Sequence, residues 1–203
     1  NVRGGGTISN NLISDNAGRG ISLDDDGSGR DNIIVSGNTI VNNDYGLNVT
    51  SYADEDKVEI TNNLFYGNRG LHSYSYNFSD MLINNDSNDN YIPSTVVLTN
   101  NNFDQSTDGI YIIRPFSIDD SNLNNVDPLF IYAANGNYRL SSSSPLINQG
   151  LATDNAPSVD LDGNTRIVGS SIDIGAYEYD IDASEYQNVI TPSSSAISDA
   201  STN

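Results

Sequence analysis

The sequence has no cysteine and no tryptophan, and it has one methionine, one histidine and only eight lysine and arginine residues in 203. Without cysteine, neither disulfide bonds nor thiolate metal sites can form. The 27 Asp and Glu residues give a net charge of −19, and nucleic acids and anionic lipid surfaces repel such a polyanion. No stretch reaches the roughly 18 consecutive apolar residues that a membrane span requires. We therefore expect no nucleic-acid partner and no membrane insertion.

A short phrase occurs four times instead. It reads apolar, Ser or Thr, any, Asn, any, apolar, and a glycine followed by an apolar residue comes a few positions later. The copies lie at 8–13, 35–40, 60–65 and 98–103, and their asparagines are Asn11, Asn38, Asn63 and Asn101. The asparagines are 27, 25 and 38 residues apart. A repeat near this period is typical of a solenoid.

Each copy contains short apolar runs with a period of two, which predicts β-strands rather than helices. Three such strands and tight corners fit into about 25 residues at roughly 3.3 Å per residue. We predict three inward-facing columns of stacked residues. They are Ile8, Val35, Ile60 and Leu98; Ile13, Ile40, Phe65 and Phe103; and Ile21, Leu47, Leu71 and Ile110. An excursion at 74–94 would account for the 38-residue spacing.

The repeated asparagine lies between two strands, where it tolerates a left-handed backbone and bonds the turn with its side chain. Stacked copies about 4.8 Å apart would join amide to amide. We therefore predict a structural ladder formed by Asn11, Asn38, Asn63 and Asn101.

The repeat resembles that of the pectate-lyase-like superfamily of parallel β-helices. Further motifs at 125–130, 137–140, 143–150, 160–166 and 173–179 resemble the closing module called choice-of-anchor Q in secreted bacterial proteins. The resemblance implies an all-β fold, a right-handed single-stranded parallel β-helix with about four recognisable rungs and an irregular C-terminal capping module. The expected divisions are rungs over 1–115, the closing module over 116–180 and a Ser-rich tail or linker over 181–203.

In-register stacking of the glycine-led strands would place polar and aromatic residues side by side on one outer face. These candidate ligand-binding residues are Ser22, Asn48, His72, Tyr74 and Tyr111. Aromatic rings stack on apolar sugar faces and amides bond sugar hydroxyls, so the face is suited to a polysaccharide or surface glycan. An ordinary solvated face is the alternative.

The sequence offers two candidate catalytic sets for a polysaccharide-cleaving enzyme. Arg69, His72 and Tyr74 offer a cation for a uronate carboxylate and a base for the α-proton, as a lyase needs, although His72 equally fits an incidental surface histidine. A glycosidase needs two carboxyl groups facing across a bond. The consecutive side chains of Asp54, Glu55 and Asp56 point in different directions and form a poor pair.

Calcium is the one metal that the sequence suggests. Asp24, Asp26 and Ser28 have the spacing of the first donors of an EF-hand loop, with Asp31 as a further donor, but Val35 stands where that loop needs glutamate. Asp160, Asp162 and Asp173 form a second candidate set. For the second set, the alternative is an Asp/Gly turn of the closing module.

These observations favour a non-catalytic structural or adhesive module on a bacterial cell surface or outside the cell. The first residues already belong to a repeat, so we expect a longer precursor or a covered first rung. Self-association through that rung or through the C-terminal tail would build head-to-tail assemblies. The alternatives are a polysaccharide lyase or glycoside hydrolase that has further rungs, and a trimeric phage or secretion-system fibre.

Overall fold

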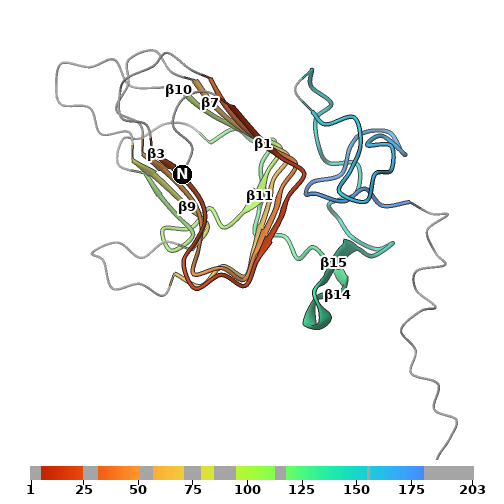
Figure 1. Cartoon of the computed structure of the whole chain (residues 1–203), viewed down its shortest axis with the longest axis horizontal. Coiled ribbons are helices and arrows are strands. Elements are labelled where there is room, and N and C mark those ends of the chain that lie inside the picture. The colour runs from red at the N-terminus through yellow and green to blue at the C-terminus, as the bar shows by residue number, and fades with distance from the viewer. Residues whose placement is uncertain are drawn as a thin grey trace, which may run out of the picture.

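The computed structural model describes residues 6–24, 32–50, 57–70, 79–84, 95–112, 118–154 and 156–180. Three parallel sheets wind into a coil, and Figure 1 looks down the stack of its rungs. The first sheet contains β1 (Gly6–Ser9), β4 (Ile33–Ser36), β7 (Lys57–Thr61) and β10 (Thr95–Thr99). The second contains β2 (Leu12–Ser14), β5 (Thr39–Val41), β8 (Leu64–Tyr66), β11 (Asn102–Phe103) and β13 (Leu123–Asn124). The third contains β3 (Arg19–Asp24), β6 (Tyr45–Thr50), β9 (Met81–Asn84) and β12 (Ile110–Ile112).

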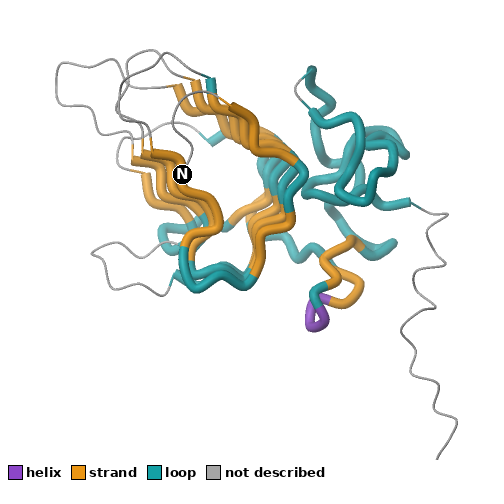
Figure 2. The backbone as a smooth tube through the Cα atoms, in the orientation of Figure 1, coloured by secondary structure: helices purple, strands orange, loops and turns teal. Residues whose placement is uncertain are grey.

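Each rung contributes one strand to every sheet, which confirms the predicted all-β parallel β-helix (Figure 2). Four rungs are complete, and β13 begins a fifth, so the stacking continues past residue 115. No α-helix occurs in the described ranges; the one helical element there is the short 3-10 turn η1 (Ala133–Asn135). None of the described helices is long and apolar enough to cross a membrane.

The interior is filled by the columns that the repeat predicts, with one exception. The first two columns stack in register, as Ile8 beside Val35 and Ile13 beside Ile40 illustrate. In the third column, Met81 pairs with Leu47 and Ile110, in the place predicted for Leu71. The prediction was wrong because it took the glycine at 70 as the start of the strand. The strand comes later, where Met81 and Ile83 alternate inward and are almost fully buried.

The asparagine ladder is present and is longer than predicted. The main-chain N–H and side-chain Nδ2 of Asn38 both donate to Oδ1 of Asn63, at 3.0 and 2.9 Å. Asn11 bonds Asn38 in the same way, and Asn63 bonds Asn101. Asn101 continues to a fifth member, Asn122, which lies outside the repeated phrase. The ladder therefore satisfies buried polar groups at one corner of every rung.

The left-handed backbone lies one residue earlier than expected. Asn10, Gly37, Asn62 and Asn100, each immediately before a ladder asparagine, have φ between 52° and 63°. The residue in this conformation turns its side chain outward, and the next asparagine turns inward to its stack. The left-handed turn and the ladder hydrogen bonds thus belong to two neighbouring residues, whereas the sequence predicted that one asparagine would provide both.

A second ladder, missed from the sequence, lies at the next corner. Asn16, Asn43 and Asn68 stand five positions after Asn11, Asn38 and Asn63, and that spacing was the available signal. Each of the first two donates to Oδ1 of the next. Asn68 then donates to Oδ1 of buried Asp80 at 2.9 Å, while Oδ2 of Asp80 accepts the main-chain N–H of Asp104 at 2.8 Å. An acceptor-only carboxylate ends this ladder.

The C-terminal module, defined here as residues 126–180, lies beside the second sheet rather than over an end of the coil (Figure 1). Its strands β14 (Phe130–Tyr132) and β15 (Asn137–Leu140) pair antiparallel, and most of the remainder is irregular. Two apolar clusters join it to the outer face of the second sheet. One contains Val41, Tyr138, Ala176 and Tyr177, and the other Leu64, Leu140, Leu146 and Ile174.

We expect Asn63→Leu to lower the free energy of unfolding by about 3 kcal/mol, because it leaves the buried amide groups of Asn38 without their acceptor. The matched control is Asn135→Ala at an exposed position of η1, expected to change stability by less than about 0.5 kcal/mol. Urea unfolding followed by circular dichroism measures both. Equal effects would show that the ladder contributes nothing particular to stability.

Candidate functional site

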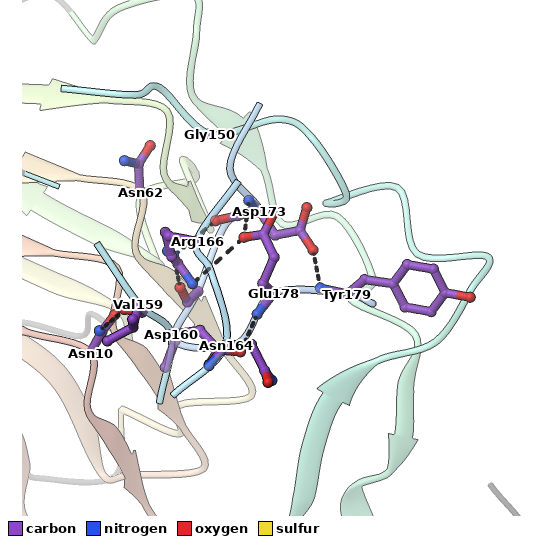
Figure 3. A network of polar contacts seen from close by, with 12 residues as sticks. Asn10, Asn62, Gly150, Val159, Asp160, Asn164, Arg166, Asp173, Glu178 and Tyr179 are labelled. Atoms are coloured by element: carbon purple, nitrogen blue, oxygen red, sulfur yellow. Dashed lines mark hydrogen bonds and ion pairs between the residues drawn. The ribbon is translucent and has the colours of Figure 1, made fainter. Parts of the chain in front are cut away.

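The seam between the coil and the C-terminal module is built by the outward-turned corner residues. Nδ2 of Asn62 donates to the carbonyl of Leu151 at 2.9 Å, and Oδ1 of Asn62 accepts the N–H of Leu151 at 2.8 Å. In the rung after it, Asn100 donates to the carbonyl of Gln149. In the first rung, Asn10 donates to the carbonyl of Val159 (Figure 3). Three rungs are thus fixed to one module by the same kind of bond.

The second rung differs because Gly37 occupies this corner with φ of 63°. A Cβ atom there would lie 3.1 Å from Nη2 of Arg166, so the glycine leaves room for the guanidinium. The side chain of Arg166 is 2% exposed. Its Nη2 donates to the carbonyls of Asp173, at 3.1 Å, and Gly175. At this point of the seam a buried cation therefore packs against the corner of the rung, and it donates to carbonyls of the module itself.

Three buried carboxylates hold the loops around Arg166 (Figure 3). Oδ1 of Asp173 accepts the N–H of Asn148 at 2.7 Å, and Oδ2 accepts that of Tyr179 at 2.6 Å. Oε2 of Glu178 accepts the N–H of Asp173 at 3.0 Å. Because these loops lack a strand ladder, the carboxylates supply the acceptors that buried N–H groups require.

The third carboxylate, Asp160, lies in the turn before Arg166. Its Oδ1 accepts the N–H groups of Asp162 and Asn164 at 2.9 and 2.8 Å, and its Oδ2 accepts the N–H of Glu178 at 3.0 Å. One carboxylate thus joins the 160–164 turn to the last described segment. The Asp-Gly phrase that suggested calcium forms a hydrogen-bonded turn.

Burial governs the electrostatics of this network. Desolvation raises the pKa of Glu178 to about 7 and raises that of Asp173 above its ordinary value. Desolvation also lowers the pKa of Arg166, while Glu178, Asp173 and Asp160 act in the opposite direction. Nη1 of Arg166 lies 3.9 Å from Oε2 of Glu178, which is an ion-pair distance and too long for a hydrogen bond. The network therefore holds a carboxyl group that titrates near neutral pH.

A pocket of about 260 Å³ opens beside these carboxylates. Asp173, Glu178 and Tyr179 line it together with Asn148, and Ile147 and Val168 add apolar surface. Chemically, the pocket offers two buried carboxyl groups, one of which is partly protonated at neutral pH. The sequence did not indicate it, because its walls come from segments separated by up to 37 residues.

The C-terminal calcium candidates do not converge on a metal site. Asp160 and Asp173 accept main-chain N–H groups, and Asp162 forms an ion pair with Arg139 at 2.5 Å. Over the described ranges, no three His, Cys, Asp or Glu side chains are placed to hold a metal ion. The first calcium set, Asp26, Ser28 and Asp31 with the side chain of Asp24, lies outside the described residues, and calcium binding there stays a prediction.

The predicted ligand-binding column is only partly present. Ser22 pairs with Asn48, but the next position belongs to Leu82, which pairs with Tyr111. The prediction that His72 belongs to this column was therefore wrong, because Leu82 holds the position. The other candidates from these connections lie outside the described residues, as His72 itself does. They are Tyr74, Asp54, Glu55 and Asp56. Asn48 is 2% exposed, and Ser22 and Tyr111 are half-buried. Arg69, the lyase candidate, forms an ion pair with Asp44 at 2.9 Å.

The comparison with known families agrees with this geometry. Residues 2–92, which include strands β1 to β9, match a family described as "Right handed beta helix region". The match together with the stacked parallel strands identifies the fold as a right-handed parallel β-helix. No curated protein and no solved structure matches the chain.

We expect Gly37→Ala to destabilise the protein more than Gly136→Ala, although both residues have positive φ, 63° and 77°. A Cβ at Gly136 meets nothing within 4 Å, so that variant reports backbone strain alone, about 1 kcal/mol. The methyl group at Gly37 must also displace Arg166. The difference between the two free energies of unfolding, measured in urea, reports the seam contact. Equal losses of unfolding free energy in the two variants would contradict the contact between Gly37 and Arg166.

Acidification from about pH 8 to about pH 5 should stabilise the protein. Burial raises the native pKa of Glu178 from 4.5 to about 7 and that of Asp80 from 3.8 to about 6. Between these values the native state binds more protons than the unfolded state, so the free energy of unfolding rises as pH falls. Melting temperatures across this range measure the effect. Glu178→Gln should flatten the profile above pH 6, and an unchanged profile in that variant would refute the assignment.

Proposed function

We propose that the protein is a structural or adhesive β-helix module that acts on the bacterial cell surface or outside the cell without catalysis. The observation that carries this proposal is the seam. One module is hydrogen-bonded to four successive rungs, through Asn10, Thr39, Asn62 and Asn100. The buried ionisable groups of the seam hold main-chain groups, as a rigid scaffold requires.

Surface location is supported by three sequence properties. The C-terminal motifs, including 160–166 and 173–179, resemble the closing module of surface proteins called choice-of-anchor Q. The rungs resemble those of the pectate-lyase-like superfamily, which includes polysaccharide-cleaving enzymes. The net charge of −19 suits a saline or calcium-containing medium, where counterions screen self-repulsion.

Acidic connections support a calcium-dependent contact with a glycan. Segments 25–31, 51–56 and 85–94 each join the third sheet to the first sheet in successive rungs. Their sequences contain eight Asp and Glu residues and one arginine. Hard oxygen donors of this kind suit calcium, which can bridge protein carboxylates and the carboxylates of an acidic polysaccharide.

The full chain should bind pectate or alginate in the presence of calcium, lose this binding when calcium is chelated, and release no reducing ends. Affinity electrophoresis in gels with and without polymer measures the binding. Asp26→Asn with Asp31→Asn should weaken it severalfold. Asp108→Asn, at an exposed position on another corner, should leave it unchanged. Equal retention with and without calcium, or no retention, would refute the proposed contact.

Glycoside hydrolysis is the second candidate, because Glu178 and Asp173 line one pocket and the pKa of Glu178 is raised to about 7. A general acid needs such a pKa to carry its proton at neutral pH. If the pocket is catalytic, reducing ends appear from a polysaccharide substrate, and Glu178→Gln and Asp173→Asn each abolish them. Lyase activity would instead yield unsaturated products and would be lost in Arg69→Ala or His72→Ala.

A further inference from the structure

The pocket beside the seam combines acidic and apolar surface and contains no basic group. Asp173 and Glu178 line it, and its lining includes no lysine, arginine or histidine. These two carboxyl groups, 1% and 7% exposed, form what we call the floor. Ile147 and Val168 form what we call the rim, and Val168 is 44% exposed. The pocket therefore has an apolar entrance and an acidic floor.

The buried cation behind this floor does not neutralise it by contact. Arg166 is 2% exposed and its side chain is directed toward Glu178 (Figure 3), but Nη1 stays 3.9 Å from Oε2. Nε and Nη1 have no hydrogen-bond partner among the described residues, and Nη2 bonds main-chain carbonyls. One guanidinium thus stands among three buried carboxyl groups, those of Asp160, Asp173 and Glu178. Buried charges need partners, so the floor lacks a cation.

The titration of Glu178 agrees with this count of charges. Desolvation, together with the charge of Asp173, raises the pKa of Glu178 to about 7. The N–H groups of Asp173 and Val168 and the charge of Arg166 act in the opposite direction and are outweighed. Near neutral pH, a proton therefore occupies the place of the missing cation. An ammonium group close to the carboxylate can replace that proton.

We infer that this pocket binds an organic cation, a primary ammonium group on a short aliphatic stem. The ammonium donates to the carboxylates of Asp173 and Glu178, and the stem lies against Ile147 and Val168. The volume of about 260 Å³ admits a stem of several carbons. An inorganic cation leaves the rim without a contact, and a neutral alcohol leaves the floor without a counter-charge. The inference does not depend on the calcium-dependent glycan contact, and unlike hydrolysis in the same pocket it requires no catalysis.

The test titrates the full chain with n-butylammonium and follows the main-chain amide signals by NMR. We expect saturable shifts centred on Asn148, Val168 and Tyr179, which line the pocket. n-Butanol has the stem without the charge, and potassium ion has the charge without the stem, so neither should shift these signals. Nα-acetyl-lysine amide is the last probe. Binding as tight as that of butylammonium assigns the pocket to lysine side chains, and weaker binding assigns it to free amines.

The affinity should rise with pH, because the ammonium group competes with the proton on Glu178. The dissociation constant of butylammonium should fall about tenfold from pH 6 to pH 8, as expected for a carboxyl group with a pKa of about 7. An alkylammonium ion stays charged throughout this range. The NMR titration repeated at three pH values measures the effect.

Two pairs of variants separate the floor from the rim. Glu178→Gln should weaken binding at least about tenfold, whereas Glu59→Gln, the same change in the first sheet, should leave it unaltered. Val168→Lys places a tethered ammonium at an exposed position of the rim. It should abolish butylammonium binding and raise the melting temperature at pH 8, and Val168→Met, of similar length and uncharged, should do neither. The Val168 pair decides the question if Glu178→Gln does not fold.

Four results would overturn the inference. One is the absence of saturable shifts with butylammonium. Another is equal binding of n-butanol, which would show a pocket for apolar groups alone. A third is displacement of butylammonium by an equal concentration of potassium ion, which would show an inorganic cation site. The last is unchanged affinity for butylammonium in both Glu178→Gln and Val168→Lys.

Discussion

The structure depends on hydrogen bonds between buried asparagine amides at the corners of the rungs. A parallel β-helix must turn its chain three times per rung, and each turn removes main-chain groups from the strand ladders. Asn38, Asn63 and Asn101 are fully buried, and each amide bonds the next rung as well as a main-chain carbonyl of the preceding one. Because one side chain serves two neighbours, the rungs stack in a single register. The apolar columns then align inside.

Buried main-chain groups also need hydrogen-bond partners in the C-terminal module, and this explains why the module contains charged groups. Its loops have few strand pairs, so their buried N–H groups need other acceptors, and Asp160, Asp173 and Glu178 supply them. Burial of three carboxylates is tolerable because Arg166 lies among them and because N–H groups stabilise the charged form. The desolvation cost of this burial appears as the raised pKa of Glu178. Asparagine side-chain amides thus stabilise the regular coil, and buried charged side chains stabilise the irregular module.

The outward-turned corner residues connect the two systems. A residue with positive φ directs its side chain away from the stack, and the module uses this side chain at Asn10, Asn62 and Asn100. Gly37 interrupts the series where the guanidinium needs space. The module thereby packs on the outer face of the second sheet.

The sequence by itself determined the period, the strand class, two of the three interior columns and the first ladder, because all of these follow from local alternation and from a repeated asparagine. It did not determine the third strand of the third rung, since Leu71 and Met81 both follow a plausible corner and only pairing with Leu47 and Ile110 selects Met81. It also did not reveal the seam. Asp160, Arg166, Asp173 and Glu178 look like turn residues in isolation. Tertiary structure decided their role, because packing of the module on the coil buries Arg166 beside Gly37 and buries the three carboxylates as acceptors of main-chain N–H groups.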